Sequence, residues 1–216
     1  MFPSLEKRNQ NYKKMAEEHI CPIWVGYLLA SPLRRILQNP DKIFGKYIKS
    51  GMNVIDIGCA MGFFSLPLAK LVGKDGSVIC IDVQEKMLEK LEKRVEKAQL
   101  DEIIESRLCT SNSLQINDMN GQIDFVLAFA VIHEVGNKEQ LFSEIYRSLR
   151  QGGKMLIAEP KGRVSKENLG ESIDIARKIG FEIIAHPPIS KSLTVLLQKS
   201  RVKKSRSNSL LNVFLF

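Results

Sequence analysis

A short loop of small residues carries the clearest chemical signal in this chain. Residues 56–62 read D-I-G-C-A-M-G and stand between an apolar, β-branched run and a helical pattern. Small residues let the backbone approach a ligand closely, and glycine adopts dihedral angles that other residues resist. Asp82 follows Gly62 by twenty residues, at the end of the next β-branched run. Because a carboxylate in that place can accept two hydrogen bonds from a ribose diol, the pattern indicates a nucleoside-containing ligand.

Two classes of nucleoside ligand fit such a loop, and spacing separates them. Dinucleotide-binding loops use G-x-G-x-x-G, which seats a pyrophosphate on a helix N-terminus. Here Gly58, Ala60 and Gly62 recur at every second position, and G-x-G-x-x-G is absent. The carboxylate of Asp56 adds negative charge beside the loop, which favours a cation with an ammonium and a sulfonium over a pyrophosphate. The alternative is a tight turn without a ligand, and Asp82 argues against it.

The loop needs a scaffold, and the chain predicts one of alternating strands and helices. Short β-branched runs predict strands at 54–57, 77–82, 103–108, 123–129, 154–159, 181–185 and 193–197. Helical patterns lie between them at 63–71, 85–99, 137–149 and 165–180. This alternation predicts an α/β fold, a doubly wound, seven-stranded and mostly parallel sheet covered on both faces. The last two strands have no helix between them, so we expect an antiparallel last strand.

Length and composition indicate one globular domain with terminal extensions. The chain has 216 residues, of which 44% are hydrophobic and 26% charged, values typical of globular proteins. We expect an N-terminal helical extension at 1–49, the α/β domain at 50–198, and a basic then apolar tail at 199–216. No apolar run approaches the roughly 18 residues of a membrane span, and the N-terminus lacks a signal-peptide pattern. We therefore expect a soluble, cytoplasmic protein with no membrane span.

Net charge and metal-binding residue types give weaker signals. The formal net charge is +8, but residues 199–206 (K-S-R-V-K-K-S-R) carry five cations and no acid, and without them it is +3. This tail either contacts an anionic partner, such as nucleic acid or a membrane surface, or keeps the chain soluble. The four cysteines form no C-x-x-C pair and the three histidines no H-x-x-x-H pair. No metal site is predicted from that spacing, and the oligomeric state has no signal in the sequence.

The loop and several later segments resemble a known family. Residues 54–62 (V-I-D-I-G-C-A-M-G) resemble motif I of the class I S-adenosylmethionine-dependent methyltransferases. Residues 123–126 are similar to the motif IV strand of that family, and 149–153 (L-R-Q-G-G) to its usual Leu-Lys-Pro-Gly-Gly turn. The resemblance covers about residues 50–198 and is strongest to the quinone-biosynthesis-like, small-molecule methyltransferases. It implies S-adenosylmethionine as the cofactor.

The same resemblance implies which positions bind that cofactor. They are the loop residues Asp56, Gly58, Ala60 and Gly62, then Asp82 on the ribose hydroxyls, Val83 against adenine, and Phe129 at the end of the fourth strand. Two positions depart from the family pattern. Ala60 replaces the middle glycine, and Ser111-Asn112-Ser113 stands where an aspartate usually meets the adenine amino group. The side-chain carbonyl of Asn112 can accept that hydrogen bond instead.

Candidate catalytic and acceptor-binding residues follow later strands. His133 and Glu134 lie just past the fourth strand, where family members place substrate-facing residues. Because histidine titrates near neutrality, His133 is the expected general base, or else a group that orders the loop. Glu134 is then an orienting partner or a solvated acid. We expect Glu159, at the end of the fifth strand, to contact substrate. Trp24 and Tyr27 either form a lid over an apolar or aromatic acceptor or pack on the sheet.

Three functions remain open at this point. The first is methyl transfer to a small-molecule acceptor, the second is RNA or protein methylation using the basic tail, and the third is cofactor binding without catalysis. Against the second, the fourth strand lacks the Asn/Asp-Pro-Pro-aromatic signature of amino-group nucleic-acid methylases. Only Ala60 and the missing aspartate support the third.

Two further patterns have plainer explanations. Cys21, Cys59 and Cys109 would hold a soft acceptor only if the N-terminal segment folds over the loop. Lysines and glutamates alternate along 85–99, which predicts a mixed, solvated helix face rather than a phosphate-binding track.

Overall fold

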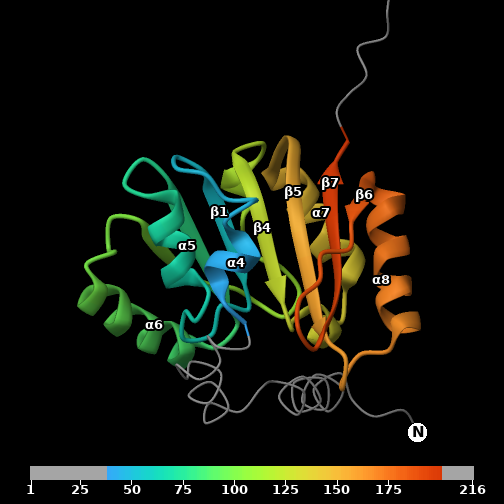
Figure 1. Ribbon diagram of the computed structural model, residues 1–216, viewed down its shortest axis with the longest axis horizontal. Coiled ribbons are helices and arrows are strands. Elements are labelled where there is room, and N and C mark those ends of the chain that lie inside the picture. The colour runs from blue at the N-terminus through green and yellow to red at the C-terminus, as the bar shows by residue number, and fades with distance from the viewer. Residues whose placement is uncertain (1–37, 201–216) are drawn as a thin grey trace, which may run out of the picture.

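A single sheet of seven strands forms the centre of the computed structural model, which describes residues 38–200 (Figure 1). The strands are β1 (Asn53–Ile57), β2 (Ser77–Asp82), β3 (Ile104–Leu108), β4 (Ile123–Phe129), β5 (Leu149–Pro160), β6 (Phe181–Ala185) and β7 (Ser192–Lys199). Their order in the sheet is β3-β2-β1-β4-β5-β7-β6. β1 is parallel to β2 and β4, whereas β7 is antiparallel to β5 and β6. The predicted fold with an antiparallel last strand is confirmed.

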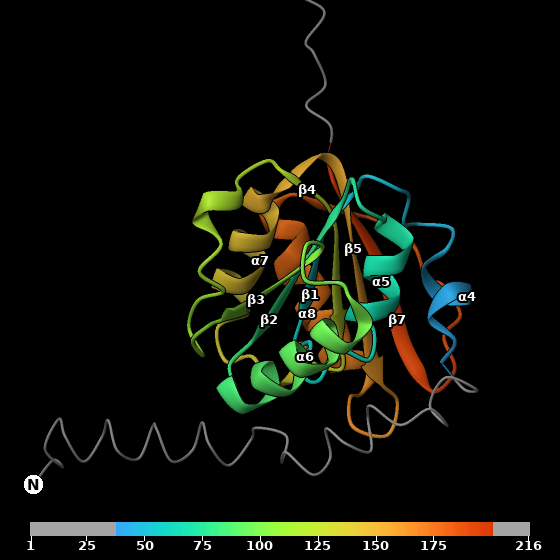
Figure 2. The ribbon, with the colours of Figure 1, turned by 90° about the vertical axis from the view of Figure 1, so that its left-hand side faces the viewer.

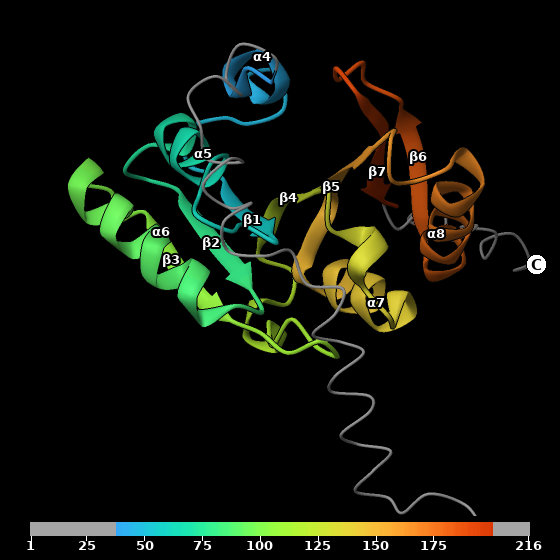
Figure 3. The ribbon, with the colours of Figure 1, turned by 90° about the horizontal axis from the view of Figure 1, so that it is seen from below.

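Helices cover both faces of this sheet, as the edge-on views show (Figures 2 and 3). One face packs against α4 (Pro40–Phe44), α5 (Ser65–Val72) and α6 (Glu85–Ala98), and the other against α7 (Lys138–Ser148) and α8 (Lys166–Ile179). Side chains alternate between the faces along each strand. Accordingly Val54 lies in the core beneath α5 and α6, and its neighbour Ile55 lies in the core beneath α7 and α8. The sheet therefore has two buried faces.

Several helix ends follow the capping residues that the sequence predicts. The Oδ1 of Asn137 accepts a hydrogen bond from the Gln140 N–H at 3.0 Å, and the Oγ of Ser165 accepts one from the Asn168 N–H at 3.1 Å. α8 ends at Ile179 and is followed by the cap residue Gly180, whose φ of +123° favours glycine. These local signals fix where α7 and α8 begin and where α8 ends.

Several element boundaries differ from the prediction by one or more residues. The helix expected from residue 63 begins at Ser65, because the hydrogen bond from the Gly62 N–H to the Cys59 oxygen keeps the preceding residues in a turn. β5 begins at Leu149 rather than at 154, because Leu149 already pairs with Ile123 of β4 before the register shifts. The helix predicted to end at 149 therefore stops one residue earlier.

Some predicted features fall outside the described residues. These are Trp24 and Tyr27 of the expected lid, Cys21, and the tail from residue 201 onward. Within residues 38–200, no helix is both long enough and apolar enough to cross a membrane.

Candidate active site

The predicted site residues that lie within 38–200 gather along one edge of the sheet, where the parallel strands end. β1 and β4 are neighbours at the centre of the sheet. From β1 the next strands, β2 and β3, follow on one side, and from β4 the next strand, β5, follows on the other. Such a switch point leaves a crevice outside the carboxyl ends of the strands, where open α/β sheets bind ligands. The loops that follow β1, β2, β3, β4 and β5 therefore converge there.

The loop after β1 alternates between ordinary and left-handed backbone. Gly58, Ala60 and Gly62 have φ values of +67°, +47° and +77°. A Cβ atom on Gly58 would lie 2.8 Å from Cγ2 of Val131, and one on Gly62 would lie 2.3 Å from Cδ1 of Leu91. The small residues at every second position are thus required by dihedral angle and by close packing, and Ala60 is the one that carries a side chain in a left-handed conformation.

Asp82 holds this loop through its carboxylate. Its Oδ2 accepts a hydrogen bond from the Ala60 N–H and its Oδ1 accepts one from the Gln84 N–H, both at 2.9 Å. Asp82 is 6% exposed, and this burial raises the pKa of its carboxyl. The hydrogen bonds from the two backbone N–H groups act in the opposite direction and lower that pKa. Each carboxylate oxygen has a further lone pair, so Asp82 can shape the loop and still accept a bond from a ligand.

Asp56 and Arg94 stabilise the same loop through hydrogen bonds to residues in it and just after it. The Oδ2 of Asp56 accepts a hydrogen bond from the Ser65 hydroxyl at 2.6 Å, which joins the end of β1 to the start of α5. Arg94, on α6, donates to the carbonyl oxygen of Met61, and burial lowers the pKa of its guanidinium. Sequence reasoning missed Arg94, although its position three residues after buried Leu91 indicates that it faces inward.

His133 and Glu159 form the most distinctive pair at this edge. Glu159 has a side chain only 1% exposed, and its Oε2 contacts Nδ1 of His133. Its Oε1 accepts hydrogen bonds from the N–H groups of Val131 and Ile132, at 3.1 and 2.9 Å. Both oxygens of Glu159 therefore hold the loop after β4. The adjacent β4 and β5 place the Glu159 carboxylate beneath that loop, and the predicted contact of Glu159 with substrate stays a prediction.

The second ring nitrogen of His133 has a different environment. Nε2 is buried and has no hydrogen-bond partner among residues 38–200. Oε1 of Glu134 lies 3.8 Å from this nitrogen and 3.9 Å from the guanidinium of Arg163. Burial raises the pKa of Glu134, while the charges of His133 and Arg163 lower it. The loop thus presents an imidazole nitrogen next to a partly buried carboxylate.

The remaining predicted cofactor residues lie at the same edge. Val83 follows Asp82 and is 41% exposed, which leaves an apolar surface beside the carboxylate. Phe129 ends β4 and is half-buried, with its ring 4.5 Å from that of Phe64 between centroids. Asn112 is exposed in the turn after β3, where its N–H lies 3.4 Å from Oγ1 of Thr110.

Two of the described cysteines have thiols whose pKa is raised by burial. Cys59 and Cys80 are buried, and burial raises the pKa of Cys59 well above its ordinary value. Cys109 is half-buried, and burial together with the charge of Asp82 raises its pKa to about 12. Thiols of this kind are weak nucleophiles and weak metal ligands.

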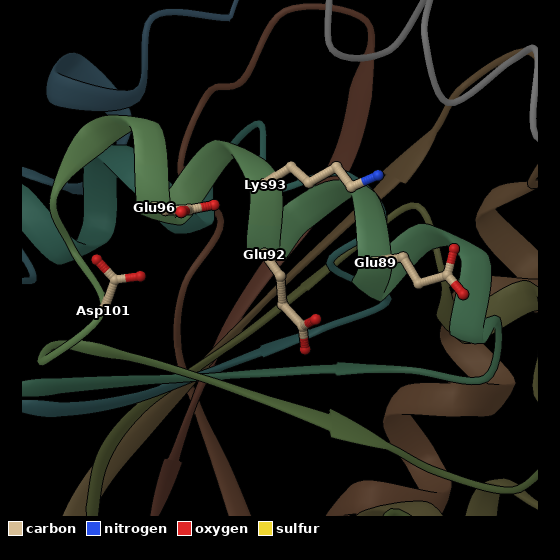
Figure 4. Close-up of a pocket in the computed structure, with 5 residues that line it drawn as sticks. All are labelled: Glu89, Glu92, Lys93, Glu96 and Asp101. Atoms are coloured by element: carbon tan, nitrogen blue, oxygen red, sulfur yellow. The ribbon is translucent and has the colours of Figure 1, made fainter.

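A hollow beside α6 is separate from this edge. Its lining residues are Glu89, Glu92, Lys93, Glu96 and Asp101 (Figure 4). All five are exposed. Three glutamates and a lysine of α6 thus form an exposed, mixed-charge face with Asp101, which follows the helix, and this is the mixed, solvated face that the sequence predicts.

Comparisons with known proteins place this geometry in context. Residues 48–201 match a family model described as a methyltransferase domain. A demethylmenaquinone methyltransferase of Lactobacillus johnsonii is 32% identical over 119 residues, which are 55% of this chain and 48% of the relative. An arsenite methyltransferase of Halobacterium salinarum is 31% identical over 109 residues, 50% of this chain and 27% of the relative. The chain thus matches about half or less of the length of these curated relatives.

A solved structure supports the fold. A methyltransferase from Aquifex aeolicus, described as dependent on S-adenosylmethionine, aligns with a TM-score of 0.74 at 24% identity. The alignment covers 83% of this chain and the whole of that one. Likeness at this identity shows the architecture, and the chemistry must be argued from the residues.

Proposed function

The chain belongs to the methyltransferase-domain family, of the class I S-adenosylmethionine-dependent type that its motifs resemble, and we propose that it methylates a small-molecule acceptor that His133 deprotonates. The observation that carries this proposal is the environment of the two ring nitrogens of His133. One is engaged by a buried carboxylate, and the other is buried without a partner among residues 38–200.

The residues at the sheet edge fit S-adenosylmethionine. The left-handed loop at 58–62 has no room for side chains at Gly58 and Gly62. Without those side chains, a ligand can approach the loop backbone closely. Asp82 has lone pairs left for ribose hydroxyls, and exposed Val83 offers apolar surface to a purine. When bound, the cofactor supplies an electrophilic methyl group on a sulfonium.

His133 has the arrangement of a general base. Because a carboxylate accepts hydrogen bonds and cannot donate, the contact with Glu159 fixes the proton of neutral His133 on Nδ1. Nε2 then carries the lone pair and can accept a proton from an acceptor hydroxyl. The imidazolium that forms is stabilised by Glu159, as an orienting carboxylate does for histidine bases in general. Glu159 is thus proposed as a positioning residue.

The aromatic residue that ends β4 favours a small acceptor with an apolar, planar body. Phe129 is half-buried and precedes His133 by four residues, and aromatic rings of this kind stack on planar groups. Two similar relatives are named for small-molecule acceptors, a demethylated menaquinone and arsenite. Transfer of a proton to Nε2 requires an acceptor with an acidic O–H group, so we propose a hydroxylated, planar compound such as a phenol or hydroquinone.

Binding and transfer can be tested separately. Calorimetric titration with S-adenosylmethionine and S-adenosylhomocysteine should show binding that Asp82→Ala abolishes and that Asp101→Ala, at an exposed acid, leaves unchanged. A labelled-methyl assay against hydroquinones and phenols should then give product with the wild type. His133→Ala should lose about a hundredfold or more in rate while it still binds S-adenosylhomocysteine. No cofactor binding at millimolar ligand would overturn the proposal, and so would an unchanged rate in His133→Ala.

A further inference from the structure

A buried carboxylate on α7 takes no part in the proposed transfer chemistry. Glu144 is only 3% exposed, and its Oε2 accepts a hydrogen bond from the backbone N–H of Leu114 at 2.6 Å. Its Oε1 accepts one from the side-chain amide of Gln140 at 2.5 Å. Gln140 lies one turn earlier on the helix, and its own N–H is held by the cap residue Asn137. Burying an acid is unfavourable unless it is bonded, and here one of the bonds reaches outside the helix.

The bond from Leu114 closes the turn that follows β3. The turn begins beside the ribose-facing position, because the Cys109 N–H donates to the carbonyl oxygen of Asp82 at 3.0 Å. Within it, the Thr110 N–H donates to the Ser113 oxygen, and the Ser113 N–H donates to Oγ1 of Thr110, both at 3.1 Å. β2 therefore fixes one end of the turn, and Glu144 fixes the other.

We propose that Glu144 is a positioning residue that sets the turn at 110–113 against the purine ring of the bound cofactor. The inference rests on the proposed function, in which Asp82 meets the ribose. The base of a nucleoside extends from its ribose, and the turn after β3 is the next loop along the sheet edge from β2. Asn112 is exposed at this turn, so its side chain and the neighbouring backbone are available to a base.

The contact is well suited to a positioning role because it joins an exposed turn to a helix. Without it, the turn would be fixed at one end only, by the hydrogen bond from Cys109 to Asp82. The side chain of Leu114 is buried in the core beneath α7, so its N–H cannot turn to water if Glu144 is removed. A buried donor without a partner is unfavourable, and the turn would relieve this by moving away from the position that the purine requires.

The test compares ligands with and without a purine. Affinities of S-adenosylhomocysteine and of S-ribosylhomocysteine, which lacks the base, are measured by NMR titration with the wild type, Glu144→Gln and Glu144→Ala. We expect Glu144→Ala to bind S-adenosylhomocysteine about tenfold more weakly and S-ribosylhomocysteine as the wild type does. Glu144→Gln keeps an acceptor for the Leu114 N–H and should restore wild-type affinity. Asp82→Asn should weaken both ligands.

Several outcomes would overturn the inference. Equal weakening of both ligands by Glu144→Ala would show a general structural role, and unchanged affinity for both would show no role. If Glu144→Ala does not fold, Gln140→Ala is measured in its place. Gln140 is half-buried, and its replacement removes only one of the hydrogen bonds to the Glu144 carboxylate. That variant should show a smaller, purine-dependent loss, and a loss shared by both ligands would overturn the inference. Failure of the wild type to bind S-adenosylhomocysteine would instead overturn the proposed function, and this inference with it.

Discussion

The carboxylate of Glu159 and the imidazole of His133 meet at Nδ1, while the other Glu159 oxygen holds the two backbone N–H groups that precede the histidine. One buried side chain therefore fixes both the path of the loop and the orientation of the ring on it. Glu159 lies on β5 and His133 on the loop that follows β4, and the two are brought together because Phe129 of β4 pairs with Ala158 of the parallel β5.

Replacement of Glu159 by glutamine tests this relationship. A glutamine amide can donate to Nδ1, which would move the imidazole proton to Nε2 and remove the lone pair that the proposed mechanism needs. We expect the rate of methyl transfer to fall by about a hundredfold or more, with little change in S-adenosylhomocysteine affinity. Glu171→Gln, at an exposed position of α8, is the matched control and should have no effect. A wild-type rate in Glu159→Gln would contradict the assigned tautomer.

Much of the fold was predictable because its signals are local. The β-branched runs predict all seven strands, and caps such as Asn137 and Ser165 predict the starts of α7 and α8. The start of β5 was not predictable, because Leu149 joins the sheet through its pairing with Ile123, a contact that no local pattern contains.

In the candidate site, too, local patterns were predictable and contacts between distant segments were not. The residue types and spacing predict which side chains reach the sheet edge, and Asp82, His133 and Glu159 are all there. What each side chain contacts depends on strand order and register. Glu159 was expected to contact substrate, and only the pairing of β4 with β5 shows that its carboxylate lies under the loop at 131–133. Glu144 was missed for the same reason, since its partner Leu114 is on a distant loop.

Substitutions at two positions of the glycine loop should change the free energy of unfolding in opposite directions. Gly62→Ala would place a Cβ against Leu91 in a backbone with φ of +77°, and we expect a loss of about 2 kcal/mol in the free energy of unfolding. Ala60→Gly relieves a left-handed alanine with φ of +47° and should stabilise by up to about 1 kcal/mol. Gly170→Ala, inside α8 with open space around it, should stabilise slightly and serves as a control. Urea unfolding measures all three, and a stabilised Gly62→Ala would contradict the packing argument.

The partly buried Glu134 predicts a pH-dependent effect on stability. Its side chain is 26% exposed, and burial raises its pKa in the folded state above the value in the unfolded chain. The folded state therefore binds this proton more tightly, and stability is lost as pH rises through the folded pKa. Glu134→Gln removes that loss, so it should be more stable than the wild type at pH 7. The difference should vanish below about pH 4, where the acid is protonated in both states. Urea unfolding at both pH values checks this, and a less stable variant at pH 7 would contradict it.

Cys109 should react slowly with alkylating agents for an electrostatic reason. Burial and the nearby charge of Asp82 raise its pKa to about 12, so almost no thiolate exists at pH 8. We expect iodoacetamide to modify Cys109 in the native protein at least about tenfold more slowly than in the urea-unfolded chain, as measured by peptide mass spectrometry. Asp82→Asn removes one of the causes and should speed the native reaction without bringing it to the unfolded rate. Equal native and unfolded rates would show a reactive thiol, and would reopen the interpretation in which cysteines hold a soft acceptor at this edge of the sheet.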